Sequence, residues 1–131
     1  MSPIPIIVCG RSTEIAHKVT LDMQPEYDVV KIVLSPEEGI EEIPKYLSGQ
    51  NPPRAVALGG AFDDATVESM RDAASKAGEV VWLRVDKSRQ SEMPSMDDKE
   101  VFGAALAERM KASLQEHNVG QGGASSGVYF F

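Results

Sequence analysis

The chain has 131 residues, of which 42% are apolar and 25% charged, and its formal net charge at pH 7 is −7. This size and composition are typical of one soluble globular domain, and the acidic balance argues against binding to nucleic acid or to anionic membrane surfaces. No apolar run approaches the ~20 residues that span a bilayer, and residues 1–5 lack the features of a secretory signal. The sequence has a single cysteine, which excludes an intrachain disulfide. We therefore expect a cytoplasmic protein.

The chain opens with an apolar strand that runs directly into a turn and a helix. Residues 5–9 are uniformly apolar, which is typical of a strand buried on both faces of a parallel sheet. Gly10 and Arg11 form the turn, Ser12 is placed to cap the helix, and Pro25 ends it. Four residues at helical spacing form its apolar face: Ile15, Ala16, Val19 and Met23.

Three further strands are predicted, over residues 27–34, 54–58 and 79–85. The segment after the first of these starts as a helix, with Ser35 as the cap and a proline at the first helical position. Because Pro44 falls inside this segment, one helix and two short turns broken near Pro44 are equally compatible with the sequence.

The remaining helices are marked by acidic caps. Asp63 or Asp64 begins the third helix, and the capping box at residues 97–100 begins a fourth, which extends to about His117. Between the fourth strand and this last helix, residues 87–96 are polar and show no periodicity, which predicts an exposed loop.

The C-terminal segment combines a flexible composition with an apolar end. Residues 120–127 contain four glycines and two serines, which predicts a linker after a single domain at 1–119. An apolar tail follows: Val128, Tyr129, Phe130 and Phe131. We expect this tail to dock on its own domain as an extra strand or cover, and the alternative is a homodimer in which it contacts a second copy.

The alternation of strands and helices predicts an α/β fold of three layers, with helices on both faces of a parallel sheet of about four strands. The residues leave two strand orders open: 3-2-1-4, as in dinucleotide-binding halves, and the flavodoxin-like 2-1-3-4. In both orders, ligands bind at the carboxyl ends of the strands, where the direction of winding reverses. That edge would bring together the loops at residues 9–13, 35–38 and 59–63.

The turn after the first strand is the strongest candidate for a ligand site, because the first N–H groups of a helix lack partners and attract anions. A dinucleotide fingerprint would place glycines at positions 10, 12 and 15, whereas the chain has Gly10, Ser12 and Ile15. Arg11 supplies a cation suited to phosphate or carboxylate. The predicted cofactor-binding residues at this edge are Gly10, Arg11, Ser12, Thr13, Ser35, Gly59 and Gly60.

Residues 5–85 resemble the small Rossmann-like CoA-binding domains. The resemblance is carried by the Gly10-Arg11-Ser12 turn, which matches their G-x-S turn, by Ile43-Pro44 before the third strand, and by Val80 to Leu83 as the fourth strand. It implies the order 3-2-1-4 and a nucleotide-bearing ligand over the turn, so that NAD(P) or CoA is the implied cofactor class. The Gly59-Gly60 pair and the C-terminal third depart from that family. The whole chain is also similar to short fungal Rossmann-like proteins with no assigned activity.

Other chemistry rests on isolated residues. Cys9 is a candidate nucleophile because it precedes a helix N-terminus, which stabilises a thiolate, but a cysteine in an apolar strand is typical of a core residue. A phosphatase loop would need an arginine where Ile15 stands. Neither His17 nor His117 has a partner ligand at metal-binding spacing, and we predict no metal site.

These observations support three functional hypotheses. The first is a small domain that binds a nucleotide-type or other anionic small molecule without catalysis of its own. The second is a ligand-free interaction or homodimerisation module that uses residues 128–131. The third is an enzyme that depends on Cys9.

Overall fold

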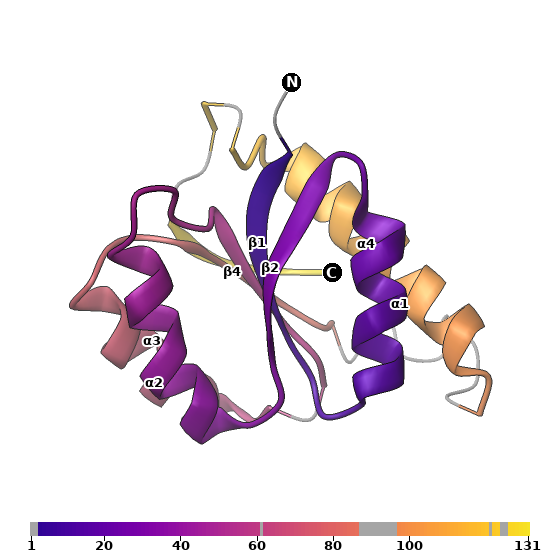
Figure 1. The fold of residues 1–131 in the computed structure, drawn as a ribbon, viewed down its shortest axis with the longest axis horizontal. Helices are drawn as coiled ribbons and strands as arrows, with labels where there is room; N and C mark the ends of the chain where they lie inside the picture. The colour runs from indigo at the N-terminus through magenta and orange to yellow at the C-terminus, as the bar shows by residue number, and fades with distance from the viewer. Residues whose placement is uncertain (1–2, 61, 87–96, 121, 124–125) are drawn as a thin grey trace.

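Strands and helices alternate along the chain in the computed structural model (Figure 1), which describes residues 3–60, 62–86, 97–120, 122–123 and 126–131. The predicted loop at 87–96 and part of the predicted linker lie outside the described residues. The elements are β1 Ile4–Cys9, α1 Thr13–Met23, β2 Tyr27–Val33, α2 Pro36–Leu47, β3 Ala55–Leu58, α3 Asp64–Ser75, β4 Val81–Arg84, α4 Lys99–Glu116 and β5 Gly127–Phe130.

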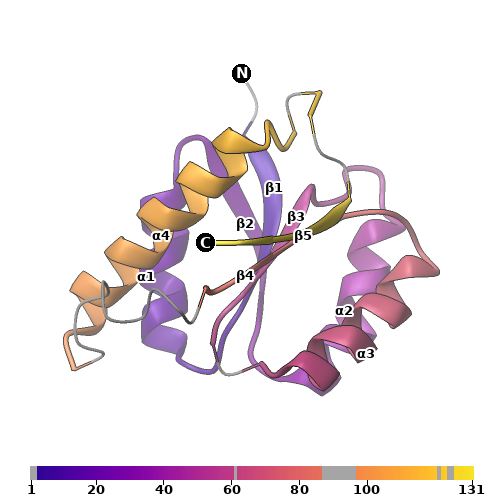
Figure 2. The ribbon, with the colours of Figure 1, turned by 180° about the vertical axis from the view of Figure 1, so that it is seen from behind.

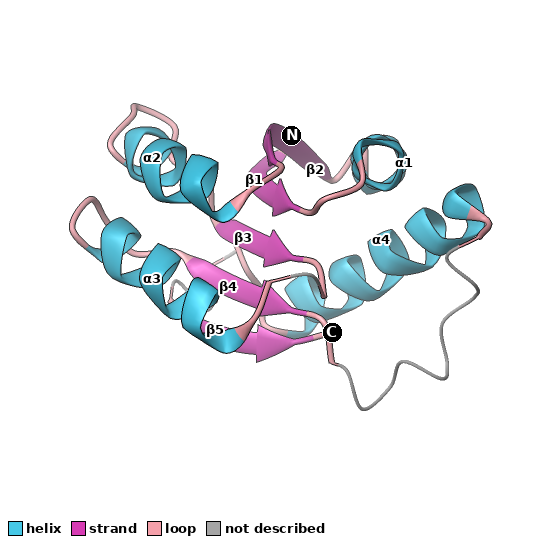
Figure 3. Ribbon diagram, turned by 90° about the horizontal axis from the view of Figure 1, so that it is seen from below, coloured by secondary structure: helices cyan, strands magenta, loops and turns pink. Residues whose placement is uncertain are grey.

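The strands form one parallel sheet in the order β2-β1-β3-β4-β5. Helices α1 and α4 cover one face of this sheet and α2 and α3 cover the other, as Figures 2 and 3 show. The predicted three-layer α/β architecture is confirmed, with one strand more than expected.

The strand order implied by the resemblance, 3-2-1-4, is wrong, and the flavodoxin-like alternative is confirmed. Strand β1 pairs with β2 on one side and with β3 on the other. Parallel strands are joined by right-handed crossovers, so two successive helices on opposite faces of the sheet make the chain move in opposite directions. Because α1 and α2 lie on opposite faces, the chain returns from β2 past β1, and β3 pairs with the free side of β1.

Alternating residues of β1 divide the core into two clusters. Ile6 and Val8 face α1 and α4, whereas Ile7 and Cys9 face α2 and α3. All four side chains are buried. Each fully buried aliphatic side chain contributes about 1.5–3 kcal/mol to folding, so β1 stabilises the core on both faces of the sheet.

Helix α2 is one continuous helix, which decides between the two alternatives that Pro44 left open. Proline in a helix interior removes one backbone hydrogen bond. The helix continues because its inner face, with Ile43 and Leu47, is buried against the sheet and α3. Ser35 and Pro36 start it as predicted, with the N–H of Glu38 donating to Ser35 Oγ at 3.2 Å.

The apolar tail folds back on its own domain, as expected. Strand β5 pairs in parallel with β4, from Val81 opposite Gly127 to Arg84 opposite Phe130. The ring of Tyr129 stacks on that of His117 at the end of α4, with 3.8 Å between centroids. The terminal Phe131 is 2% exposed and lies in the core cluster under α4.

Candidate functional site

The winding of the sheet reverses between β1 and β3, and this switch point is where ligands bind in open α/β sheets. The backbone N–H of Gly59, just after β3, donates to the carbonyl oxygen of Cys9 at 2.9 Å. The N–H of Gly10 donates to the carbonyl oxygen of Val33 at 2.9 Å. These bonds fix the ends of three neighbouring strands at one edge of the sheet.

Space is open above two of the predicted glycines. Apart from its chain neighbours, no described residue has an atom within 4 Å of a Cβ built on Gly10 or on Gly60, whereas a Cβ built on Gly59 would lie 3.4 Å from the carbonyl oxygen of Cys9. The backbone on both sides of the switch point is therefore accessible to another molecule. Gly59, by contrast, is in contact with the end of β1.

The turn after β1 presents a cation and the start of α1. Ser12 caps this helix by accepting a hydrogen bond from the N–H of Ile15 at 3.3 Å. Arg11 is exposed, and none of the ion pairs among the described residues involves it. Since the N–H groups of Thr13 and Glu14 open the first turn, they lack intrahelical acceptors. We call Gly10, Arg11, Ser12, Thr13, Gly59 and Gly60 the switch-point rim.

Ser35 differs from the other predicted site residues. It follows β2, at the far side of β1 from β3, and its Oγ is occupied as the cap of α2. The Glu38 carboxylate, which accepts from the N–H of Leu34 at 2.8 Å, lies in the same turn. The structure thus assigns Ser35 a role in capping, away from the switch point.

Arg84 is a residue of this edge that sequence analysis missed. It ends β4, its Nη1 lies 2.7 Å from the Asp64 carboxylate at the start of α3, and its guanidinium lies 5.9 Å from the centre of the Phe130 ring. The signal in the sequence was a charged residue immediately after the apolar run of the fourth strand. Its interaction partners depend on the tertiary structure, because they come from α3 and β5.

Cys9 belongs to the core. Its side chain is 1% exposed and packs in the cluster beneath α2 and α3. Burial, and secondarily the negative charge of Glu38, raise the pKa of its thiol far above the ordinary value of 9.0. A protonated and enclosed thiol is a poor nucleophile, so the structure favours the core interpretation of Cys9 over the catalytic one.

The acidic residues near the rim act as caps and ion-pair partners. Asp63 caps α3 by accepting from the N–H of Thr66 at 2.8 Å, and Asp64 pairs with Arg84. Within the described ranges, no three His, Cys, Asp or Glu side chains lie together in a way that would hold a metal ion.

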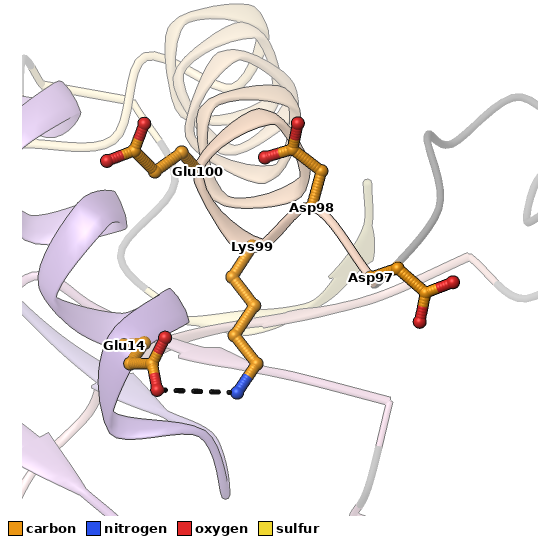
Figure 4. A pocket seen from close by; sticks show the side chains of 5 residues that line it. All are labelled: Glu14, Asp97, Asp98, Lys99 and Glu100. Atoms are coloured by element: carbon orange, nitrogen blue, oxygen red, sulfur yellow. Dashed lines mark hydrogen bonds and ion pairs between the residues drawn. The ribbon is translucent and has the colours of Figure 1, made fainter.

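An acidic depression lies beside the starts of α1 and α4. Figure 4 shows Glu14 of α1 facing Lys99 of α4, whose Nζ lies 3.5 Å from the Glu14 carboxylate, with Asp97, Asp98 and Glu100 around the same helix start. Asp98 caps α4 by accepting from the N–H of Val101 at 3.2 Å. This depression is unsuited to an anion, and the single lysine in it is engaged with Glu14.

None of the helices that the structure describes has the length and apolar character needed to cross a membrane. No family model matches the chain. The chain is 34% identical to Kojic acid related protein 6 of Aspergillus oryzae, in an alignment that covers 86% of this chain and 77% of that protein. The predicted similarity to a fungal protein is thereby confirmed. At this identity and coverage, the chain belongs to the family of Kojic acid related protein 6.

Proposed function

We propose that this protein binds a small anionic molecule of nucleotide type at the switch-point rim, without catalysis of its own. The observation that carries the proposal is the open space above Gly10 and Gly60 on the two sides of the point where the winding reverses. Glycine at such positions lets a ligand approach the backbone closely. Arg11 and the first amides of α1 would take the anionic group.

The charge balance of the rim also fits an anion. Glu14, in the first turn of α1, would repel an anion, but its carboxylate is turned to Lys99 (Figure 4). Arg84 is held by Asp64. This arrangement leaves Arg11 as the cation nearest to the open backbone of Gly10.

A thermal-shift panel with NAD, NADP, ATP, FMN and CoA tests this function. Kojic acid is added to the panel because the name of the fungal relative refers to it. A ligand present at one hundred times its Kd stabilises the folded state by about 2.7 kcal/mol, which raises the Tm of a domain of this size by several degrees.

Matched glycine variants localise the binding. Gly60→Val should fill the open space and abolish the shift. Gly78→Ala should retain it, because Gly78 lies in the loop before β4 and its added Cβ would make only ordinary contacts with Leu47 of α2. Arg11→Ala should reduce the shift. Ser12→Asp keeps a capping side chain and adds a negative charge, so it should fold normally and lose the ligand. Two outcomes would contradict the proposal. One is a panel in which no compound changes the Tm of the wild-type protein, and the other is a shift in Gly60→Val and Arg11→Ala as large as that of the wild type.

Homodimer assembly is a second candidate function, favoured by the position of β5. This strand ends the sheet and carries no charged side chain, and Phe130 is 57% exposed. Uncharged edge strands pair readily with other strands. Light scattering coupled to size exclusion should then give twice the chain mass of 14.2 kDa, and Phe130→Lys should restore the monomer. A monomeric wild-type protein at 100 μM would exclude this candidate.

A further inference from the structure

The carboxyl ends of four neighbouring strands form one row at the edge of the sheet that holds the switch-point rim. Cys9 of β1 is paired in register with Leu58 of β3. The pairing continues from Leu58 to Arg84 of β4 and from Arg84 to Phe130 of β5, and Figure 3 shows these strands running side by side in one direction. Three strand spacings of about 4.8 Å separate Cys9 from Phe130, or roughly 14 Å. The row therefore connects the backbone of the rim to an aromatic ring.

The side chain of Phe130 is open to solvent. The residue is 57% exposed, whereas its neighbours Tyr129 and Phe131 pack in the core cluster under α4. The guanidinium of Arg84 lies over the Phe130 ring, 5.9 Å from its centre, and is itself held by the Asp64 carboxylate at 2.7 Å. Exposed aromatic rings and nearby arginines are the groups on which the bases of nucleotides stack. The end of the row thus has the chemistry of a base-stacking surface.

We infer that the Phe130 ring stacks against the aromatic base of a nucleotide whose phosphates are held by Arg11 and the start of α1. The inference rests on the proposed function, because the anionic end of the ligand lies at the switch-point rim. It also names the class of ligand, since only a nucleotide with several phosphates or a dinucleotide is long enough to follow the row. Between the two ends, such a ligand would pass over the open backbone of Gly60.

The test compares whole nucleotides with their fragments. Isothermal titration calorimetry of the full chain gives the Kd of ATP, of NAD, of adenosine and of inorganic tripolyphosphate. We expect ATP or NAD to bind about tenfold or more tightly than either fragment, because only the whole nucleotide reaches both ends of the row. In the wild-type complex, nuclear Overhauser effects should connect the adenine protons to the ring protons of Phe130.

Variants of Phe130 separate stacking from simple apolar contact. Phe130→Leu keeps an apolar side chain but removes the aromatic face, so the Kd of the whole nucleotide should rise about tenfold, whereas the Kd of tripolyphosphate should not change. Phe130→Trp enlarges the aromatic face and should bind at least as tightly as the wild type. Leu21→Ala is the matched control, because Leu21 is an exposed apolar residue of α1, and it should bind like the wild type.

Failure of the stacking and failure of the proposed function give different results. Equal affinity of ATP and NAD for the wild type and Phe130→Leu would overturn the stacking and leave anion binding at the rim intact. Tripolyphosphate that binds as tightly as ATP would do the same, as would a wild-type complex without contacts between the adenine and the Phe130 ring. If none of the four compounds binds, both the stacking and the proposed function are wrong.

Discussion

Gly103 of α4 lies against Lys18 of α1 so closely that a Cβ on Gly103 would come within 2.8 Å of the Lys18 Cγ and 2.9 Å of its Cβ. The same Cβ would lie 3.4 Å from the carbonyl oxygen of Ile15. The absence of a side chain at Gly103 therefore permits the close pairing of α1 and α4. The Lys99–Glu14 and Lys111–Glu26 pairs also connect α4 to α1 and to the loop that follows it.

Gly103→Ala should destabilise the protein. Overpacking of this kind costs roughly 1–3 kcal/mol, and the better helix propensity of alanine offsets about 1 kcal/mol of it. The difference is a net loss of about 0–2 kcal/mol in urea unfolding, and we expect a value near the middle of that range. Gly10→Ala, where the added methyl group meets open space, is the control and should change the free energy of unfolding by less than about 1 kcal/mol. Increased stability of Gly103→Ala would contradict the close contact.

The two terminal phenylalanines should differ sharply in their contribution to stability. Phe131→Ala removes a side chain that is 2% exposed, for which the usual loss is about 3–5 kcal/mol. Phe130→Ala removes a largely exposed ring that lies over Arg84, and the loss should stay near or below ~1 kcal/mol. Chemical denaturation of both variants measures the difference. Equal losses would show that β5 does not dock in solution as it does in this structure.

Replacing Pro44 by alanine should stabilise α2. Alanine restores the backbone N–H that can donate to the carbonyl oxygen of Ile40, and its helix propensity exceeds that of proline by about 3 kcal/mol. The greater entropy of the unfolded chain offsets roughly 0.4–1 kcal/mol of this gain. The lost packing of the proline ring offsets a further part of it. We expect a higher Tm for Pro44→Ala. Pro36→Ala is the control, because a proline at the first helical position lacks no needed hydrogen bond, and its Tm should not rise.

Cys9 should make the protein sensitive to alkaline pH. The unfolded thiol ionises near its ordinary pKa of 9.0, whereas burial keeps the folded thiol protonated to higher pH. The unfolded state therefore binds fewer protons above pH 9, and stability falls with pH there by up to about 1.4 kcal/mol per pH unit. Below pH 9 the group adds no pH dependence.

Denaturant unfolding of the wild type and of Cys9→Ala between pH 8 and 10.5 measures this effect. The variant should be less stable at pH 8 because a core side chain is truncated, but its stability should decline less steeply above pH 9. The Tyr27 phenol, whose pKa burial also raises, adds the same alkaline decline to both proteins. Parallel curves for the two proteins, or rapid alkylation of native Cys9 at pH 7, would contradict the buried, protonated thiol.

Local sequence determined the elements and their starts. The caps at Ser12, Ser35 and Asp98 each accept from a backbone N–H three residues later, and this interaction depends only on residues within one turn. The apolar runs likewise located the strands to within two residues at each end, although β4 is shorter than the predicted 79–85. Short-range hydrogen bonding and hydrophobic periodicity were sufficient for this part of the fold.

Tertiary structure alone decided the strand order and the surroundings of Arg84. A strand such as β1 is apolar on both faces, so its pattern does not specify on which face the next helix packs, and that choice determines where β3 pairs. Arg84 meets Asp64 and Phe130 from elements distant in sequence.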